Sequence, residues 1–483
     1  MSLQNSNFEL VSGLEIHVQL NTNTKIFSAD SAAFGASPNQ NISTVSLALP
    51  GALPKLNKEV VAKAVRIGLA LNCTINQINH FDRKNYFYAD LPKGYQITQD
   101  NQPICVNGFL EVELADGSTK KIGINRIHLE EDAGKSIHDQ DDQYSLVDLN
   151  RAGVPLIEIV TEPDIRSAEE ASALLSEIRK LVRHLNVSDG NMEEGSLRCD
   201  ANISIRPVGT TEFGTRCEVK NLNSMRNVRR AMDFEFGRQV EVISNGGKII
   251  QSTLNFDAEN GTTSPMRTKE EANDYRYFSD PDLQPIHISD SWLAEIKSAM
   301  PALPNEISKK MIAEFSISKA DAALFAEDLA LLTYFNAALP LVNTKKSLIN
   351  WLIGPVRAIL NEKAITIDVY KVKPEQLAVA VNLVDDKKLT QQIAIQQLLP
   401  AIETKADTDV AELAQTLNLL ITENGDELGS FIDEVLNKYP QQVEAYKKGK
   451  KGVLGLFVGD VMKLAKGKAD AKKLNELILE KLK

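Results

Sequence analysis

The sequence predicts an α+β protein: an N-terminal cradle domain built on a mixed or antiparallel β-sheet, then an all-helical domain, then a small helical tail domain. Up to about residue 293, several segments alternate apolar and polar residues as half-buried strands do, without repeating as βαβ units. Beyond residues 300–304 the pattern is helical and rich in Ala, Leu, Lys and Glu. A second boundary near residues 405–408 gives the expected domains 1–293, 294–407 and 408–483.

Three helices are expected in the first domain. Asn57 can cap a helix over residues 58–72, and Ser167 opens a second one with a capping-box pattern. Ser224 begins a third helix, which Gly246 and Gly247 end.

Two strands of the first domain carry an acid among apolar residues. In residues 14–20, four apolar side chains alternate with polar ones, so Glu15 and His17 share the polar face, roughly 6–7 Å apart. Residues 155–160 place Glu158 inside an apolar run. Such a carboxylate needs a partner, because burying an unpaired charge costs several kcal/mol or shifts its pKa.

A third strand, within residues 122–135, ends in Glu130, Glu131 and Asp132. Strand parity alone does not choose between the two glutamates. Hard oxygen ligands with at most one imidazole suit Mg²⁺ or Mn²⁺ better than Zn²⁺. Together the three strands are therefore expected to form one divalent-metal site, of the kind that holds substrate phosphates.

Two further strands are expected to support this site. Residues 196–206 and 215–220 both alternate, and a hairpin centred on Gly209 would set Asp200 opposite Glu218. Directly opposed carboxylates repel. A bound cation could offset that repulsion, as could three side chains nearby, Arg198, Arg216 and Lys220.

Each segment taken alone is explained equally well as a solvated sheet face with ordinary ion pairs. The set of five favours a metal and phosphate site. Of the six histidines, only His17 is expected to lie beside a carboxylate on a polar strand face.

Longer motifs in these segments resemble the GatB family, a family of tRNA-dependent amidotransferase subunits, in the expected order along the whole chain. They are G-L-E-I-H-V-Q-L (13–20), F-D-R-K-N-Y-F-Y (81–88), H-L-E-E-D-A-G-K-S (128–136), D-L-N-R-A-G-V-P-L-I-E-I-V (148–160), E-E-G-S-L-R-C-D-A-N-I-S (193–204), K-N-L-N-S (220–224) and D-Y-R-Y-F (274–278).

The resemblance implies an ATP-dependent carbon–nitrogen ligase. The family phosphorylates the side-chain carboxylate of Glu on misacylated tRNA(Gln), or of Asp on tRNA(Asn), and ammonia from a partner amidase subunit then displaces phosphate. Implied cofactors are ATP and Mg²⁺, and implied partners are a GatA-like amidase subunit and a small GatC-like subunit in a heterotrimer, with aminoacyl-tRNA as substrate.

The resemblance also ranks the candidate residues. The main Mg²⁺ site is expected to comprise Glu15, His17, Glu131 and Glu158, with Glu131 preferred and Glu130 a neighbour. Asp200 and Glu218 are expected to hold a second cation or to position the nucleotide. Three cations are candidates for neutralising phosphate, Lys84, Arg198 and Lys220.

One departure from the family concerns zinc. Many relatives carry a C-x-C and C-x-x-C knuckle where this chain has four other residues, Ser28, Asp30, Ser43 and Ser46. None of them is a thiol, so no structural Zn²⁺ is expected there.

Composition indicates a cytoplasmic protein. The four cysteines show no C-x-x-C spacing, which favours free thiols. No run approaches 18 apolar residues, so no membrane span is expected, and the N-terminus lacks the pattern of a targeting sequence.

The net charge of −11 is awkward for an RNA-binding protein, but its distribution is uneven. Residues 437–483 hold 12 Lys and 5 acidic residues, a net of +7, so the rest of the chain carries −18. A basic tail on an acidic body is the asymmetry expected if the tail contacts RNA, although a solvated amphipathic helix pair also fits.

Two other functions remain open from the residues. One is a non-catalytic scaffold that docks tRNA onto a separate amidase. The other is a free-standing carboxylate–amine ligase acting on a small molecule, which the basic tail disfavours. Nothing in the sequence resembles the nucleophile segment of an amidase or a Cys–His glutaminase pair.

Overall fold

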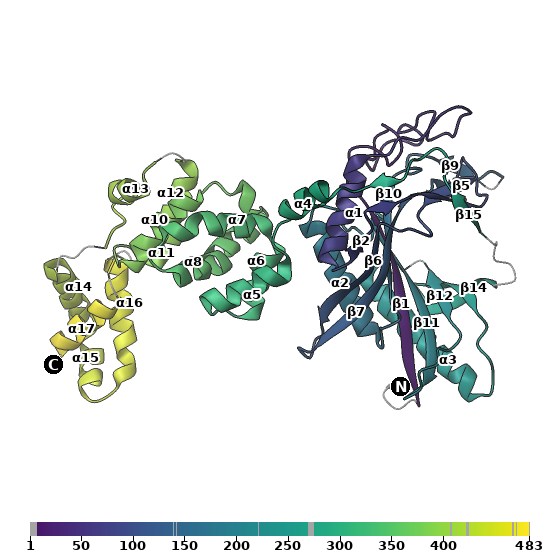
Figure 1. Ribbon diagram of the computed structural model, residues 1–483. Helices are drawn as coiled ribbons and strands as arrows, with labels where there is room; N and C mark the ends of the chain where they lie inside the picture. The colour runs from purple at the N-terminus through teal and green to yellow at the C-terminus, as the bar shows by residue number, and fades with distance from the viewer. Residues whose placement is uncertain are drawn as a thin grey trace. The chain divides into compact units, whose positions relative to one another are not determined.

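The computed structural model describes residues 7–138, 140–141, 143–220, 222–268, 275–405, 408–421, 425–465, 468–469 and 471–482. Asn221 and Asp274 of the motifs, and Asp407 at the expected second boundary, lie outside the described residues. The chain divides into two compact units, Met1–Leu303 and Pro304–Lys483. The first is built on sheets and the second is helical, so the α+β prediction is confirmed (Figure 1).

A nine-stranded sheet forms the first unit, in the order β14-β13-β12-β11-β1-β10-β7-β6-β2. All neighbours are antiparallel except β12 and β13, which are parallel, so the sheet is mixed. Its strands are β1 (Phe8–Gln19), β2 (Thr74–Ile75), β6 (Cys105–Glu113), β7 (Thr119–Glu131), β10 (Pro155–Thr161), β11 (Leu197–Pro207), β12 (Cys217–Lys220), β13 (Ser252–Asp257) and β14 (Thr262–Thr268).

Three smaller sheets complete the first unit. They are β15-β4-β5, formed by Arg276–Ser279, Asp82–Asn85 and Tyr95–Thr98; β16-β3, formed by Ile286–His287 and Ile78–Asn79; and β8-β9, formed by Lys135–Ile137 and Leu146–Asp148.

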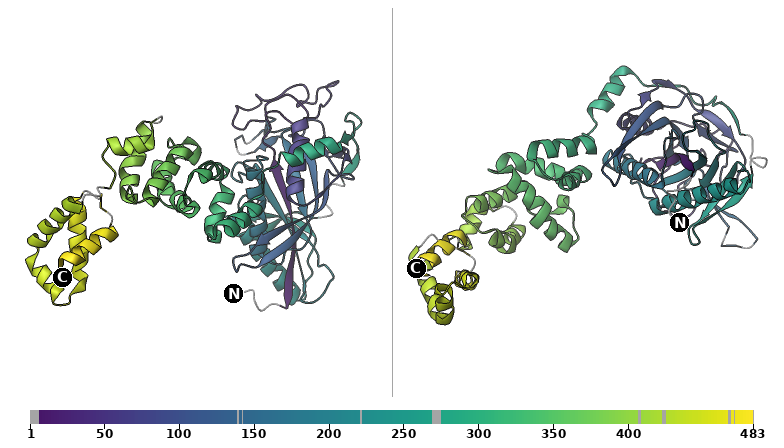
Figure 2. Two further views of the ribbon diagram at one scale, coloured as in Figure 1. Left: turned by 60° about the vertical axis from the view of Figure 1, so that its left-hand side comes forward. Right: turned by 90° about the horizontal axis from the view of Figure 1, so that it is seen from below.

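Helices cover one face of the large sheet (Figures 1 and 2). They are α1 (Lys58–Ala70), α2 (Ala168–His184) and α3 (Met225–Ser244), and α4 (Asp290–Ser298) packs on α1. The predicted caps are present, since the side chains of Asn57, Ser167 and Ser224 each accept a backbone hydrogen bond from the first turn that follows.

The alternation in β1 decides which face the helices cover. Leu14, Ile16 and Val18 are fully buried in the core beneath the helices. Glu15 and His17 are only partly buried and must therefore lie on the opposite face. One face of the sheet thus builds the hydrophobic core, while the other is left free to carry polar side chains.

Two separate hydrophobic cores form the helical unit. The first runs from Ile307 to Leu419 and includes the buried Trp351. The second runs from Leu428 to Leu482. Because Val410 and Leu413 pack in the first of these cores, the separate tail core begins only after residue 419.

The helices of the second unit are short. They are α5 (Pro304–Phe315), α6 (Lys319–Glu327), α7 (Leu329–Ala338), α8 (Lys345–Trp351), α9 (Arg357–Lys363), α10 (Pro374–Asp385), α11 (Gln391–Ile393), α12 (Leu399–Thr404), α13 (Val410–Thr416), α14 (Gly425–Lys438), α15 (Pro440–Lys447), α16 (Leu454–Leu464) and α17 (Ala471–Leu482), with 3₁₀ or π turns at Leu339–Leu341, Leu352–Val356, Ile367–Val369, Ala394–Leu398 and Lys451–Val453.

All four cysteines are free and buried, as predicted. Among the described residues, no single helix has the length and apolar character needed to cross a membrane. Only the pair Lys319–Glu327 and Leu329–Leu341, bent by 103°, reaches that threshold by length and composition.

Close packing between α1 and β6 gives a stability prediction. A Cβ at Gly108 would meet the Leu71 carbonyl oxygen at 2.5 Å and would also collide with the Cys73 sulfur. Gly108→Ala should therefore lower the free energy of unfolding by about 1–3 kcal/mol. Gly237→Ala in α3, where a Cβ meets nothing within 4 Å, should instead raise it by about 0.5–1 kcal/mol. Urea unfolding of both variants checks this, and equal effects would contradict it.

Candidate active site on the polar sheet face

The polar face of the large sheet is ordered by cross-strand register. His17 of β1 stands opposite Glu158 of β10 and, on its other side, opposite Arg198 of β11. Glu158 in turn stands opposite His128 of β7. One row of four charged or ionisable side chains therefore crosses four adjacent strands, in the order His128, Glu158, His17 and Arg198, with a single acid among three bases.

A first cluster forms around Glu158. The Nε2 atom of His128 lies 3.0 Å from a Glu158 carboxylate oxygen, and His17 Nε2 lies 3.6 Å from it. Glu130 joins from β7, with its carboxylate 3.8 Å from His17 and 3.7 Å from His128. His17, Glu130 and Glu158 bring three potential ligand atoms within 4.8 Å of one another.

Electrostatics in this cluster favours charged forms despite burial. Burial alone would lower the pKa of His128, but Glu158 and Glu130 raise it to about 9. Burial would raise the pKa of Glu158, yet His128 and His17 hold that pKa well below its usual range. At neutral pH the pair is therefore an ion pair.

A second cluster comprises Glu15, Asp200 and Glu218, whose carboxylate oxygens also lie within 4.8 Å of one another. Lys220 bridges two of them, with its Nζ 2.9 Å from Asp200 and 2.7 Å from Glu218. Burial raises the pKa of Glu15, and Glu158 and Glu218 raise it further, while a hydrogen bond from Asn202 opposes the shift.

The predicted hairpin register was wrong by two residues. Glu218 pairs with Asn202, so the register places Asp200 beside Lys220 rather than opposite Glu218. A shift of two keeps every side chain on its face, which is why the acids still meet. Pairing Asp200 with a lysine relieves the direct opposition of two carboxylates.

Glu131 does not join the first cluster, and Glu130 takes the place expected for it. Alternation along β7 puts Glu130 on the face of His128 and turns Glu131 away. The Glu131 carboxylate instead accepts hydrogen bonds from Lys93, at 2.7 Å, and from the Ile97 backbone N–H, at 2.9 Å. The expected set of Glu15, His17, Glu131 and Glu158 is thus split, with Glu15 in the second cluster.

The three cations nominated for phosphate differ in their surroundings. Arg198 donates to Asp132 at 2.9 Å and Lys220 is held by two carboxylates. Lys84 lies over aromatic rings, 4.6 Å from the Tyr275 centroid. In the described part of the chain, Lys84 is the one of the three with no carboxylate within 4.0 Å.

Sequence reasoning missed His128. The expectation that only His17 lies beside a carboxylate on a polar strand face was wrong, because His128 is two residues before Glu130 on the same strand. The two-residue spacing that paired Glu15 with His17 was the available signal.

The donor set fits a hard divalent cation. At bonds of about 2.0–2.1 Å, neighbouring ligands of an octahedral Mg²⁺ lie ~3 Å apart and opposite ones ~4 Å apart. In the first cluster His17 lies 3.6 Å from Glu158 and 3.8 Å from Glu130, and in both clusters the ligand atoms lie within 4.8 Å of one another. Five carboxylates with one imidazole are the ligand chemistry of Mg²⁺ rather than of Zn²⁺.

Comparison with known proteins agrees with this geometry. The model of the GatB/GatE catalytic domain matches residues 10–294, and that of the GatB domain matches residues 333–482. This chain belongs to the GatB family.

Similar curated proteins are named as a subunit of aspartyl/glutamyl-tRNA(Asn/Gln) amidotransferase. The one from Clostridium novyi (strain NT) is 46% identical over 476 residues, and the one from Syntrophotalea carbinolica 47% over 477, with 99% of both chains covered in each case. That from Chlorobium chlorochromatii is 46% identical over 475 residues, covering 98% of this chain and 99% of the relative.

The four positions of the family's zinc knuckle come together in a hydrogen-bonded cluster. The Asp30 carboxylate accepts hydrogen bonds from Ser28 at 2.9 Å, from Ser43 at 2.8 Å and from Ser46. These bonds hold the pKa of Asp30 below its usual value, although burial opposes the shift. We call these four residues the Asp30 cluster.

Lys25 supplies the positive charge beside the Asp30 cluster. Its side chain is 1% exposed, and its Nζ donates to the carbonyl oxygens of Asn41, at 2.7 Å, and Leu149, at 3.3 Å, and to Ser46 Oγ at 3.4 Å. Burial lowers the pKa of Lys25 to about 8.

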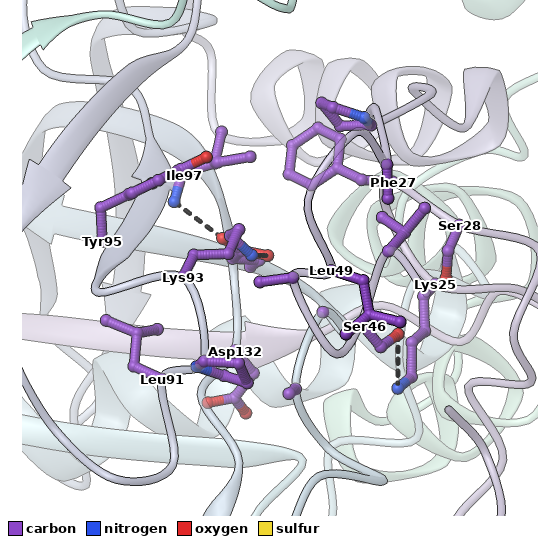
Figure 3. Close-up of a pocket in the computed structure, with 18 of the residues that line it drawn as sticks. Lys25, Phe27, Ser28, Ser46, Leu49, Leu91, Lys93, Tyr95, Ile97 and Asp132 are labelled. Atoms are coloured by element: carbon purple, nitrogen blue, oxygen red, sulfur yellow. Dashed lines mark hydrogen bonds and ion pairs between the residues drawn. The ribbon is translucent and has the colours of Figure 1, made fainter. Parts of the chain in front are cut away.

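A cavity of about 200 Å³ separates Lys25 from the pair of Lys93 and Glu131. Figure 3 shows Lys25 and Ser46 facing each other along one wall, with Lys93, Tyr95 and Ile97 along another. The Asp30 cluster therefore positions a wall of the cavity that Glu131 lines.

Removing the Asp30 carboxylate tests how much the Asp30 cluster contributes to the stability of the fold. Asp30→Ala leaves three hydroxyls without their shared acceptor and removes a negative charge near the buried Lys25, so the free energy of unfolding should fall by about 2–4 kcal/mol. Urea unfolding measures this, and limited proteolysis should cut within residues 28–57.

Asp116→Ala is a matched control, because Asp116 accepts two hydrogen bonds from Ser118 in an exposed turn. Its cost should stay below about 1 kcal/mol. A chelator should leave the wild-type midpoint unchanged. Equal costs for the two variants, or a midpoint that falls with chelator, would refute the account.

Proposed function

We propose that this chain carries out the ATP-dependent step of a tRNA-dependent amidotransferase that uses glutamine as amide donor. It would phosphorylate the side-chain carboxylate of misacylated Glu-tRNA(Gln), Asp-tRNA(Asn) or both. The observation that carries the proposal is the pair of carboxylate clusters on one sheet face, in a chain similar throughout to proteins named as amidotransferase subunits.

His17, Glu130 and Glu158 are proposed as the main Mg²⁺ ligands, with Glu15, Asp200 and Glu218 holding a second cation or orienting the nucleotide. When bound, Mg²⁺ would neutralise charge on the transferring phosphoryl group. His128 keeps Glu158 ionised and fixes its position through the 3.0 Å contact.

The bond changes need no nucleophile from the protein. A carboxylate oxygen of the aminoacyl group attacks the γ-phosphorus of ATP, and ADP leaves. Ammonia then attacks the acyl carbon, inorganic phosphate leaves, and the amide forms. The chain's own residues bind, orient and neutralise charge, which is most of what phosphoryl transfer requires.

The relatives' names, as subunits, support an enzyme of several chains. We propose a heterotrimer with a GatA-like amidase subunit that releases ammonia from glutamine, and a small GatC-like subunit. We further propose a cytoplasmic location, where free thiols and aminoacyl-tRNA coexist. In this assembly, domain 1–293 would bind metal, ATP and the acceptor end, helical domain 294–407 would follow it, and the basic tail domain 408–483 would contact the tRNA.

Glu158→Gln should remove tRNA-dependent ATP turnover in the assembled enzyme, by two or more orders of magnitude in kcat. The amide keeps the shape of the side chain but not the charge that a divalent cation and His128 both use. ADP release with and without aminoacyl-tRNA measures it, alongside urea unfolding to show that the fold is intact.

Glu162→Gln is the matched control, since Glu162 follows β10 and accepts a hydrogen bond from the exposed Asn125. Its turnover should stay within about twofold of wild type. Wild-type turnover by Glu158→Gln at saturating Mg²⁺ would show that Glu158 has a structural role and is not needed for catalysis. If the wild-type enzyme showed no aminoacyl-tRNA-dependent ATP turnover, the non-catalytic docking scaffold would be the better account.

Deleting residues 425–483 should weaken aminoacyl-tRNA binding and spare ATP binding. The deletion removes the separate tail core and, within residues 437–483, a net charge of +7. Lysine–phosphate contacts release counterions, so the affinity should fall steeply with salt in the full chain and less steeply without the tail. tRNA affinity against salt and ATP calorimetry measure both effects. Equal salt slopes would place the RNA contacts elsewhere.

A further inference from the structure

Tyrosines concentrate beside the carboxylate clusters, on the three-stranded sheet β15-β4-β5. Of the ten tyrosines in the chain, five lie within or next to its strands: Tyr86, Tyr88, Tyr95, Tyr275 and Tyr277. Tyrosines that gather in this way either fill a hydrophobic core or contact a ligand.

Four of these tyrosines lie around Lys84 and β15, and we call them the tyrosine wall: Tyr86, Tyr88, Tyr275 and Tyr277. The rings of Tyr86 and Tyr88 meet edge to face at 5.7 Å, and those of Tyr86 and Tyr275 at 5.6 Å. Tyr277 of β15 joins this group through Lys84 of β4, which stands opposite it and whose Nζ lies over the rings of Tyr275 and Tyr86.

The tyrosine wall borders the carboxylate clusters. Tyr277 pairs with Lys84, and Lys84 with Gln96, whose side chain donates to the Glu131 carbonyl oxygen at 2.8 Å. Thr98, two residues further on, donates to Glu130 at 3.4 Å. Burial raises the pKa of Tyr277 to about 12, and the charges of Asp100, Glu158 and Glu130 contribute, so these acids act on its hydroxyl.

The tyrosine wall is open to solvent both beside the clusters and farther from them. Tyr277 is 39% exposed and Tyr88, in the turn between β4 and β5, is 56% exposed. A tyrosine that only filled a core would be covered. The wall therefore runs from the carboxylates outward to solvent and leaves ring surface available at both Tyr277 and Tyr88.

Positive charge accompanies these rings. Lys84 Nζ lies 4.6 Å from the Tyr275 centroid and 5.7 Å from that of Tyr86. Within the described residues no carboxylate comes within 4.0 Å of it. An unpaired cation among aromatic rings is the composition that single-stranded nucleic acid recognises, by stacking bases and pairing phosphates.

We propose that the tyrosine wall stacks the unpaired nucleotides at the 3′ end of aminoacyl-tRNA, with Lys84 contacting a phosphate of that strand. The inference rests on the proposed function and adds the surface that guides the substrate. An aminoacyl group is carried on the last nucleotide, so the strand that delivers it to Glu158 must pass beside the clusters. The wall offers four rings, whereas ATP carries a single base that could stack on them.

The test uses the assembled enzyme and tRNA whose terminal adenosine is replaced by 2-aminopurine, a base whose fluorescence falls when it stacks on an aromatic ring. Wild type should quench this fluorescence on binding. Tyr277→Leu should lose most of the quenching and bind the tRNA on the order of tenfold more weakly. Tyr277→Phe, which keeps the ring, should restore both.

Phe278→Leu is the matched control. Phe278 is the next residue on β15 and is 51% exposed, but alternation turns it to the opposite face of the small sheet. It should leave quenching and affinity unchanged. tRNA lacking its last three nucleotides should bind wild type and Tyr277→Leu equally, because the contact is to those nucleotides.

Three results would overturn the proposal. ATP affinity lost in Tyr277→Leu, with quenching intact, would assign the wall to the adenine of ATP. Failure of that variant to assemble with the other subunits would make the wall a protein interface. Equal weakening on full-length and truncated tRNA would place the effect outside the 3′ end. All three are distinct from failure of the proposed function, in which wild type itself would show no aminoacyl-tRNA-dependent ATP turnover.

Discussion

The position of β1 between two antiparallel neighbours is the constraint on which the active face depends. Because β1 pairs with β10 on one side and β11 on the other, His17 is opposite both Glu158 and Arg198. The same two-residue period buries Leu14, Ile16 and Val18 beneath the helices. A slip of one residue would exchange the two faces, burying the ionisable groups and exposing the core. Packing of the hydrophobic core therefore also fixes the cross-strand positions of the candidate metal ligands.

Most of this architecture follows from alternation, and so it could be predicted from the sequence. The strand with Glu15 and His17, the run around Glu158 and the helix caps at Asn57, Ser167 and Ser224 all match the structure. These features depend on neighbours within a few residues. Alternation also held the information for Glu130 and His128, which share a face of β7, but the resemblance to the family favoured Glu131 instead.

Other features depend on contacts that sequence does not encode locally. The hairpin register of β11 and β12 follows from the length and conformation of the loop between them, and a two-residue error in it leaves the faces unchanged. Glu131 is explained only by Lys93 and Ile97, which lie more than 30 positions earlier. The extent of the helical core to Leu419 likewise reflects packing of α13 on α10, not a change in composition.

The two kinds of polar cluster in the first unit differ in whether their negative charge is satisfied by donors and bases within the cluster. The Asp30 cluster is closed, since three hydroxyls donate to one carboxylate and the positive charge of Lys25 lies nearby. On the sheet face, acids outnumber strong bases: Glu15, Glu130, Glu158, Asp132, Asp200 and Glu218 are set against His128, Arg198 and Lys220, with His17 between them. Burial raises the pKa of Glu15, the charges of Glu158 and Glu218 raise it further, and a divalent cation would relieve this repulsion. A phosphate brought with that cation then needs a positive group, and Lys84 is the one of the three candidate cations with no carboxylate within 4.0 Å among the residues that the structure describes.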